Sequence, residues 1–240
     1  MSADDKMPNI AKNLKDVRCR IDDAAKSAGR NPSDVTLIAV SKTRPPEYVS
    51  AALAAGQLDF GENRPQELSQ KAEILPNNIK WHQIGQLQKN KVRHIIDKVC
   101  LIHSVDSVGL AAEINKRAVA IGKVQQILIQ VNISGEETKS GVSPDEVKAI
   151  CTEISNMENV RIVGLMTISV KGYDFEQNKA IFQKLADLAK EIDGLKIKNV
   201  EMRELSMGMS HDYEAAIAAG ATMVRVGTAV FGERDYGVVK

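Results

Sequence analysis

The sequence predicts an α/β fold, a single (β/α)8 TIM barrel preceded by one extra N-terminal helix. Short apolar segments rich in β-branched residues alternate with longer segments of helical periodicity, which is typical of a parallel sheet built from βαβ units. Eight such strands fit within about 200 residues, and eight is the number that closes this kind of barrel. No linker rich in Gly, Ser or Pro divides the 240-residue chain. We therefore expect one domain over residues 1–240, with residues 1–6 disordered.

The first elements are a helix, a strand and a second helix. The helix is predicted over Ile10–Ala28, where apolar residues recur at helical spacing before a glycine at the C-terminal cap. The segment Val35–Ser41 is almost continuously apolar and β-branched, as expected for a parallel strand buried on both faces. Two consecutive prolines then favour the start of a helix, which is predicted over Tyr48–Ala55 and ends at a glycine.

The alternation of strands and helices repeats to the end of the chain. Further strands are predicted at Leu58–Phe60, Ile79–Ile84, Val99–His103, Gln126–Ile133, Arg161–Ile168, Glu204–Ser206 and Met223–Val226. Helices are predicted at Pro65–Leu75, Gln86–Ile96, Val108–Ala120, Pro144–Met157, Phe175–Ile192 and His211–Ala219. A doubly wound open sheet is the competing architecture, but no G-x-G-x-x-G follows the first strand.

Charge and composition exclude several classes of protein. Thirty-two Lys and Arg against 31 Asp and Glu give a net charge of +1, which argues against a dedicated nucleic-acid binder. No apolar run approaches the roughly 20 residues of a membrane helix, and the N-terminus does not resemble a signal peptide. The dispersed Cys19, Cys100 and Cys151 form neither a metal-binding spacing nor a disulfide framework. We expect a cytoplasmic protein with no nucleic-acid or membrane partner.

Two groups of residues at the ends of predicted strands carry candidate chemistry. Lys42 follows the first strand; such a lysine is usually a solvated charge, but a desolvated one is nucleophilic and can form a Schiff base. Ser206, Ser210, Gly227 and Thr228 follow strands seven and eight, whose loops often bind phosphate in such barrels. Turn formation and helix capping are the alternative explanation for them. A Schiff-base lysine opposite a phosphate loop implies pyridoxal 5′-phosphate (PLP).

Seven segments in a fixed order resemble one protein family. They are AVSKT, FGENR, WHQIGQLQKNK, NISGEETKSG, GLMTI, ELSMGMSHDYEAAIAAG and MVRVGTAVFGERDY, between about Val35 and Tyr236. The chain resembles the pyridoxal phosphate homeostasis protein family, a single barrel related to the N-terminal domain of alanine racemase. The resemblance implies that PLP is the cofactor.

The resemblance also implies a role for each site residue. Lys42 would be the covalent Schiff-base lysine, Asn63 would lie beside the cofactor, and Arg225 would face the pyridine nitrogen. The phosphate would be bound by Ser206, Ser210, Gly227 and Thr228. One departure is Gln83, where the family commonly has an apolar aromatic residue; we expect it to weaken packing but to touch no cofactor residue.

Arg225 has a physical interpretation of its own. At a strand end an arginine commonly makes a surface salt bridge. Opposite a pyridine nitrogen, a permanently protonated guanidinium donates a hydrogen bond and keeps that nitrogen unprotonated. The ring is then a poorer electron sink, which restrains carbanion chemistry.

Three further candidates carry weaker signals. The basic cluster Lys89–His94 is explained by a solvated helix face or by an anion contact. His82, within a strand, is expected to be a hydrogen-bonded core residue rather than a base. Lys139 is either a second amine near the cofactor or a solvated side chain.

Two functions remain to be separated. The first is a PLP-binding protein without catalytic residues that buffers and delivers the cofactor, with PLP, free amino acids and PLP-dependent apo-enzymes as partners and a monomeric state. The second is an amino-acid racemase of the alanine racemase type. Such racemases resemble this barrel followed by a β-rich second domain, and they use a tyrosine as second base opposite the lysine. The chain ends shortly after the eighth predicted strand, and two-base racemisation needs an acid/base group on each face of the carbon. The sequence therefore favours the carrier.

Overall fold

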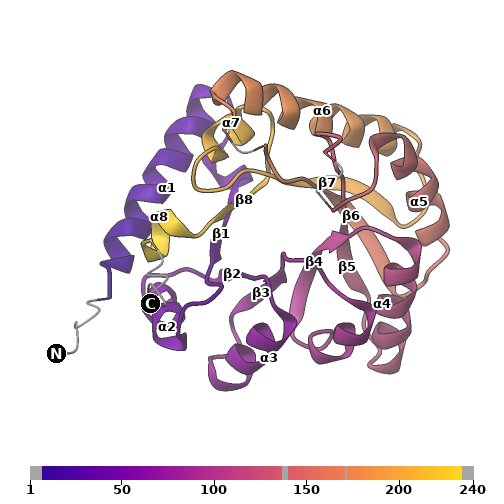
Figure 1. Cartoon of the computed structure of the whole chain (residues 1–240), viewed down its shortest axis with the longest axis horizontal. Coiled ribbons are helices and arrows are strands. Elements are labelled where there is room, and N and C mark those ends of the chain that lie inside the picture. Colours follow the sequence, from indigo (N-terminus) through magenta and orange to yellow (C-terminus); the bar gives the residue numbers. More distant parts are fainter. Residues whose placement is uncertain (1–6, 137–139, 171, 234–240) are drawn as a thin grey trace, which may run out of the picture.

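The structure is a computed structural model that describes residues 7–136, 140–170 and 172–233. Its strands are β1 (Thr36–Val40), β2 (Asp59–Glu62), β3 (Lys80–Gln83), β4 (Val99–Val105), β5 (Gln125–Gln130), β6 (Val160–Met166), β7 (Val200–Ser206) and β8 (Met223–Val226). They form a closed parallel barrel in chain order, with β8 paired to β1 (Figure 1). The predicted fold class is confirmed. The predicted disorder of residues 1–6 falls outside the described residues.

Helices surround the barrel on its outer side (Figure 1). The α-helices are α1 (Ile10–Ser27), α2 (Pro46–Ala54), α3 (Pro65–Ile74), α4 (Val108–Ala120), α5 (Val147–Ile154), α6 (Phe175–Gly194), α7 (Tyr213–Ala218) and α8 (Thr228–Phe231). Three 3-10 helices are η1 (Pro32–Asp34), η2 (Lys89–His94) and η3 (Pro144–Glu146). The extra helix α1 is present as predicted and packs against α2, α7 and α8. Among the described helices, none has both the length and the apolar character needed to cross a membrane.

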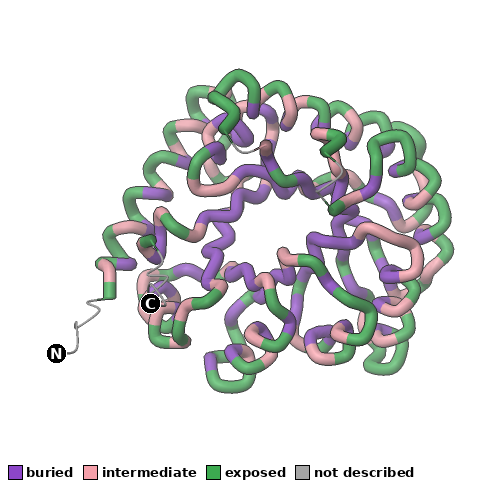
Figure 2. The backbone as a smooth tube through the Cα atoms, viewed as in Figure 1, coloured by how far each residue is buried: buried purple, intermediate pink, exposed green. Residues whose placement is uncertain are grey.

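Successive side chains of each strand point alternately outward to the helices and inward to the barrel axis. In β1, Leu37 and Ala39 belong to the large apolar layer between barrel and helices, whereas Ile38 belongs to a separate inner cluster. The inner cluster consists of Ile38, Leu101, Leu128, Val163, Met166 and Met223. The strands are accordingly buried while the outer helix faces are exposed (Figure 2). The same alternation decides which polar side chains face the barrel interior.

Most predicted elements differ from the structure by a few residues at their ends, and two differ more. The helix predicted over Gln86–Ile96 is wrong: although Leu87, Val92, Ile95 and Ile96 are buried, this segment forms only the short 3-10 helix η2. Strand β7 starts at Val200, four residues before its predicted start at Glu204. Its solvent-facing positions carry an ion pair between Glu201 and Arg203, so the segment lacks the continuous apolar run that marks β1.

Candidate functional site

A cavity of about 240 Å³ lies at the mouth of the barrel, at the C-terminal ends of the strands. This volume is slightly below the roughly 300–1,000 Å³ of pockets for drug-sized ligands, so it suits a ligand built on one ring. All predicted site residues except Ser206 line it, namely Lys42, Asn63, Ser210, Arg225, Gly227 and Thr228. Apolar walls come from Val40, Ile84, Ile168, Met209 and Phe231. The structure thus brings together six residues that lie far apart in the sequence.

Lys42 reaches this cavity because of strand alternation. Ile38 and Val40 point inward along β1, and Lys42 continues the same side of the strand to the cavity wall. Its neighbour Ser41 points the other way, is fully buried, and donates a hydrogen bond to Glu62 Oε1 over 2.7 Å. Thr43 has a left-handed backbone (φ 63°), and its N–H donates to Glu67 Oε1 over 2.6 Å. Both neighbours of Lys42 are therefore held by carboxylates.

Those carboxylates share one buried ammonium group. Lys71 Nζ lies 2.6 Å from Glu62 Oε1, 2.8 Å from Glu67 Oε1 and 2.8 Å from the carbonyl oxygen of Ser41. Burial raises the pKa of Glu62, although the charge and hydrogen bond of Lys71 oppose this shift. Lys71 is not among the residues predicted from the sequence. A signal was available, because Lys71 follows buried Leu68 by three residues and so lies on the inner face of α3.

Arg225 is a buried cation with its guanidinium at the cavity wall. Nη1 donates to Ser206 Oγ over 2.7 Å, and Nη2 donates to the carbonyl oxygen of Thr167 over 2.9 Å. Burial lowers the pKa of Arg225 to about 10, while the charge of Asp212 acts in the opposite direction. Because this value is still well above 7, the guanidinium stays protonated at neutral pH.

Ser206, which was predicted to bind phosphate, lies behind Arg225 and not at the cavity wall. Its side chain has no exposed surface and is absent from the cavity wall. Its hydroxyl accepts from Arg225 and lies 2.8 Å from His103 Nδ1. Ser206 is the last residue of β7 and still lies inside the barrel, behind Arg225, so it has no direct access to a phosphate in the cavity.

The loops after β7 and β8 form one side of the cavity. Ser210 Oγ accepts a hydrogen bond from the N–H of Gly227 over 3.3 Å, and Arg225 N donates to Gly208 O over 3.0 Å. Gly208 has φ +91°, and a Cβ there would lie 2.6 Å from Ala216 Cβ, so the close approach of loop and helix requires glycine. Ser210, Gly227 and Thr228 consequently lie together at this wall.

Gln83 also differs from expectation, because it does touch a predicted cofactor residue. Its side chain is fully buried, and Nε2 donates to the carbonyl oxygens of Asn63 (3.0 Å) and Gly85 (2.9 Å). The amide therefore ties the end of β2 to the end of β3. A polar side chain at this position fixes the backbone of Asn63, which an aromatic residue could not do by hydrogen bonding.

The three weaker candidates lie in different places, and none of them is found at the described cavity wall. His82 is buried and hydrogen-bonded within the barrel, as predicted for a core residue. The cluster Lys89–His94 forms η2 and lines none of the described cavity wall. Lys139 lies outside the described residues. Within the described part of the chain, no group of His, Cys, Asp and Glu side chains could hold a metal ion.

The charges of the cavity wall indicate the chemistry of its ligand. Lys42, Arg44 and Arg225 contribute cations, and the described wall contains no Asp or Glu. Hydroxyls of Ser210 and Thr228 lie at the same wall. A cationic wall with hydroxyl donors and one primary amine suits an anionic ligand that carries an electrophilic carbon.

Comparison with known proteins agrees with this chemistry. Residues 12–235 match the family model described as alanine racemase, N-terminal domain. The chain is 44% identical to the pyridoxal phosphate homeostasis protein of Aquifex aeolicus, covering 95% of this chain and 100% of that one. It is 42% identical to the protein of that name from Pseudomonas aeruginosa, covering 96% and 98%.

Solved structures show the same relationship. PipY of Synechococcus elongatus with PLP bound superimposes with a TM-score of 0.81 at 37% identity, covering 93% of this chain and all of that one. An alanine racemase of Clostridium difficile shares the fold with a TM-score of 0.69 at 18% identity, and the match spans 58% of its length. The chain belongs to the pyridoxal phosphate homeostasis protein family, within the group of barrels described by the alanine racemase N-terminal domain.

Proposed function

We propose that this protein binds PLP as a Schiff base on Lys42 and takes part in PLP homeostasis by buffering and delivering the cofactor. The observation that carries the proposal is the convergence of Lys42, Arg225, Ser210 and Thr228 on one cationic cavity. The PLP-bound structure of the relative PipY supports the choice of ligand. In this proposal the protein is a cytoplasmic monomer that exchanges PLP with free amino acids and PLP-dependent apo-enzymes, without a nucleic-acid or membrane partner.

The residues present fit PLP at each of its functional groups. Ser210, Gly227 and Thr228 would hold the phosphate, with the positive charge of the wall favouring the dianion. Asn63 would lie beside the ring. Lys42 would hold the aldehyde carbon, since PLP supplies an electrophilic aldehyde and a ring that withdraws electrons when it is bound. The cavity volume of about 240 Å³ suits a ligand of this size.

Arg225 argues for a carrier rather than an enzyme. A guanidinium has donors but no acceptor, so a pyridine nitrogen facing it must accept the hydrogen bond and stay unprotonated. With a pKa of about 10, Arg225 keeps this role at neutral pH. The ring would then stabilise negative charge on a bound amino acid poorly, which slows removal of the α-proton.

The racemase alternative needs a second acid/base group opposite Lys42. None of the tyrosines in the described part of the chain lines the cavity, and Tyr213 is buried elsewhere. His211 is the other ordinary acid/base side chain in the described wall, and it lies exposed in the loop after β7. Among the described residues, no hydrogen bond or ion pair orients the ring of His211, which supports the carrier.

The proposal is tested by locating the covalent bond. We expect purified protein incubated with PLP to absorb in the visible range, and borohydride reduction followed by peptide mass mapping to place the adduct on Lys42. Lys42→Ala should abolish the adduct, whereas the matched control Lys89→Ala, outside the cavity, should retain it. Adduct formation on another lysine, or no adduct at saturating PLP, would contradict the proposal.

A further inference from the structure

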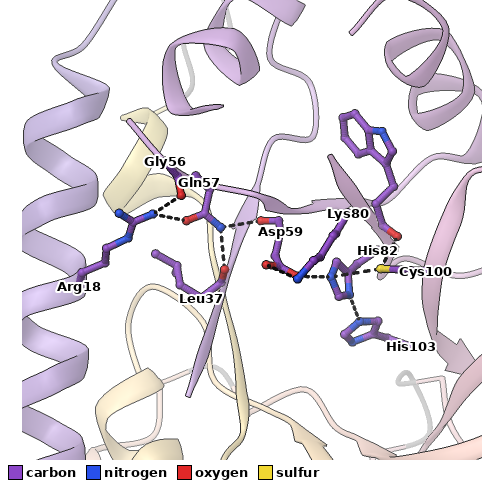
Figure 3. Close-up of polar contacts among 10 residues, drawn as sticks. Arg18, Leu37, Gly56, Gln57, Asp59, Lys80, His82, Cys100 and His103 are labelled. Carbon is purple, nitrogen blue, oxygen red and sulfur yellow. Dashed lines mark hydrogen bonds and ion pairs between the residues drawn. The ribbon is translucent and has the colours of Figure 1, made fainter. Parts of the chain in front are cut away.

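A row of polar contacts crosses the barrel interior behind the cavity. Asp59 Oδ1 lies 3.1 Å from His82 Nε2, and His82 Nδ1 lies 2.9 Å from His103 Nε2 (Figure 3). His103 Nδ1 lies 2.8 Å from Ser206 Oγ, which accepts from Arg225 Nη1 over 2.7 Å. We refer to these five residues as the polar row. It starts at the first residue of β2 and ends at the cavity wall.

The polar row is shielded from water over most of its length. His82 is 3% exposed, His103 and Ser206 are not exposed, and Arg225 is 5% exposed. Asp59, with a 20% exposed side chain, is its link to solvent. In the described residues, the barrel interior also holds the apolar inner cluster. Polar groups buried in this way are costly unless they are fully hydrogen-bonded, so the row is a constrained structure.

The outer end of the row is held in place by the extra helix. Gln57 Nε2 donates to the carbonyl oxygens of Asp59 and Leu37, each over 2.7 Å (Figure 3). Arg18 of α1 donates to Gln57 Oε1 over 3.1 Å. The backbone of Asp59 is therefore anchored, which keeps its carboxylate directed at His82.

When both histidines are neutral, Arg225 determines which group donates and which accepts in each hydrogen bond of the row. Its guanidinium can only donate, so Ser206 Oγ must accept from it. Among the described residues the Ser206 hydroxyl has one other contact, His103 Nδ1, so its proton goes there. His103 then carries its own proton on Nε2 and donates to His82, which donates to Asp59. Each hydrogen bond in the row then has one donated proton, and in each the donor lies on the Arg225 side and the acceptor on the Asp59 side.

Protonation of His82 reverses part of this arrangement. His82 would then donate from both nitrogens, so His103 must accept at Nε2 and carry its proton on Nδ1. Ser206 would receive two donors and lose the acceptor for its own hydroxyl proton among the described residues. A charge at one end of the row thereby changes the hydrogen bonds that hold Arg225 at the other end.

The groups around the two histidines favour a charge on His82 and not on His103. Burial lowers the pKa of His82, but the contacts with Asp59 and Cys100 raise it overall to about 9; Lys80 Nζ lies 4.0 Å from Asp59. Burial lowers the pKa of His103 well below its usual range, and the charges of His82 and Arg225 act in the same direction. The two histidines together thus carry at most one positive charge.

We propose that Asp59, His82 and His103 are positioning residues for Arg225, acting through Ser206, and that they couple protonation inside the barrel to the ligand at its mouth. The second part rests on the proposed function, because it concerns bound PLP. A ligand that accepts a hydrogen bond from Arg225 alters the charge next to Ser206, and through the row it alters proton binding by His82. Because linkage is reciprocal, protonation of His82 must then alter the affinity for that ligand.

The first part is tested on the ligand-free protein by nitrogen-15 NMR of its four histidines. We expect His103 to remain neutral and His82 to titrate well above 6.5. Asp59→Asn should weaken proton binding by His82 by about tenfold or more, since it removes the facing carboxylate. The control Asp97→Asn removes an exposed carboxylate outside the row and should leave His82 unchanged. If Asp59→Asn does not fold, the wild-type titration decides: an ordinary pKa for His82, or a titrating His103, overturns the proposal.

The second part is tested with PLP and absorbance. We expect the pH dependence of bound PLP absorbance to show the His82 titration, to shift with Asp59→Asn, and to lose that component in Ser206→Ala. A pH profile that is the same in wild type and both variants would overturn the coupling. Failure to bind PLP at all would refute the proposed function, while the NMR titration would still decide whether the row positions Arg225.

Discussion

The ammonium of Lys71 lies 2.6 Å from the carboxylate of Glu62, and this buried ion pair fixes the backbone that carries Lys42. The same ammonium donates to the carbonyl oxygen of Ser41, and Ser41 donates to Glu62. Because successive side chains point to opposite sides of the strand, Ser41 points outward to the ion pair, whereas Lys42 points inward to the cavity. The amine that would bind PLP is thus held from behind by charges that never enter the site.

Removing Lys71 should destabilise the protein strongly. Lys71→Met leaves Glu62 buried without a cationic partner, which typically costs about 3–5 kcal/mol. Unfolding in urea measures this loss, and the exposed Lys190→Met serves as control with an expected change within about 0.5 kcal/mol. The double variant Lys71→Met with Glu62→Leu should recover much of the stability, because the unpaired charge is gone. A single variant as stable as wild type would show that the ion pair does not hold this region.

The two buried histidines should give the free energy of unfolding a maximum near pH 6.5. The folded pKa of His82 is raised to about 9, so its contribution is fully present below 6.5 and is lost as pH rises toward 9. The folded pKa of His103 is lowered, so its contribution is present above 6.5 and is lost as pH falls. Each slope is at most about 1.4 kcal/mol per pH unit.

Urea unfolding between pH 5 and 9.5 measures this curve. His82→Gln should flatten the alkaline side, and His94→Gln, which changes a half-buried histidine outside the row, should leave both sides as they are. An alkaline slope that persists in His82→Gln would contradict the assignment.

Removing a residue that would bind the phosphate should lower the affinity for PLP but leave the affinity for pyridoxal nearly unchanged. Thr228→Ala would remove the proposed hydrogen bond to the phosphate, and a hydrogen bond to a charged acceptor is worth about 1.5–3 kcal/mol. We expect affinity for PLP to fall about ten- to a hundred-fold while affinity for unphosphorylated pyridoxal changes little. Ser206→Ala should affect both ligands alike, because Ser206 contacts Arg225 rather than the phosphate loops. Titrations monitored by absorbance distinguish the two patterns, and equal losses for both ligands in Thr228→Ala would exclude a phosphate contact.

The fold could be predicted from the sequence because several of its strands carry an apolar, β-branched run, as Val35–Ser41 does, and helical segments alternate with them. Lys42 could be predicted as well, since its place at the end of that strand sets its direction. The start of β7 could not, because Glu201 and Arg203 pair with each other on the solvent side and conceal the strand.

The errors at the site have a common cause. Ser206 and Ser210 belong to one short motif, and the point at which β7 ends decides which of them reaches the cavity: Ser206 is the last residue of the strand, and Ser210 lies in the loop after it. Gln83 and Lys71 act through contacts with residues distant in the sequence, as do His82 and His103. Their residue types indicate polarity, but their partners are set by the closure of the barrel.

The most direct test of the carrier function is to incubate PLP-loaded protein with L-alanine in D₂O, together with a PLP-dependent apo-enzyme. Each missing general acid/base group typically costs a factor of about 10²–10⁴ in rate. We therefore predict that the apo-enzyme gains activity while L-alanine shows little α-deuteration and little conversion to the D-enantiomer. Deuteration and racemisation at the ordinary enzymatic scale, a median of about 10 s⁻¹, would contradict the carrier and establish a racemase.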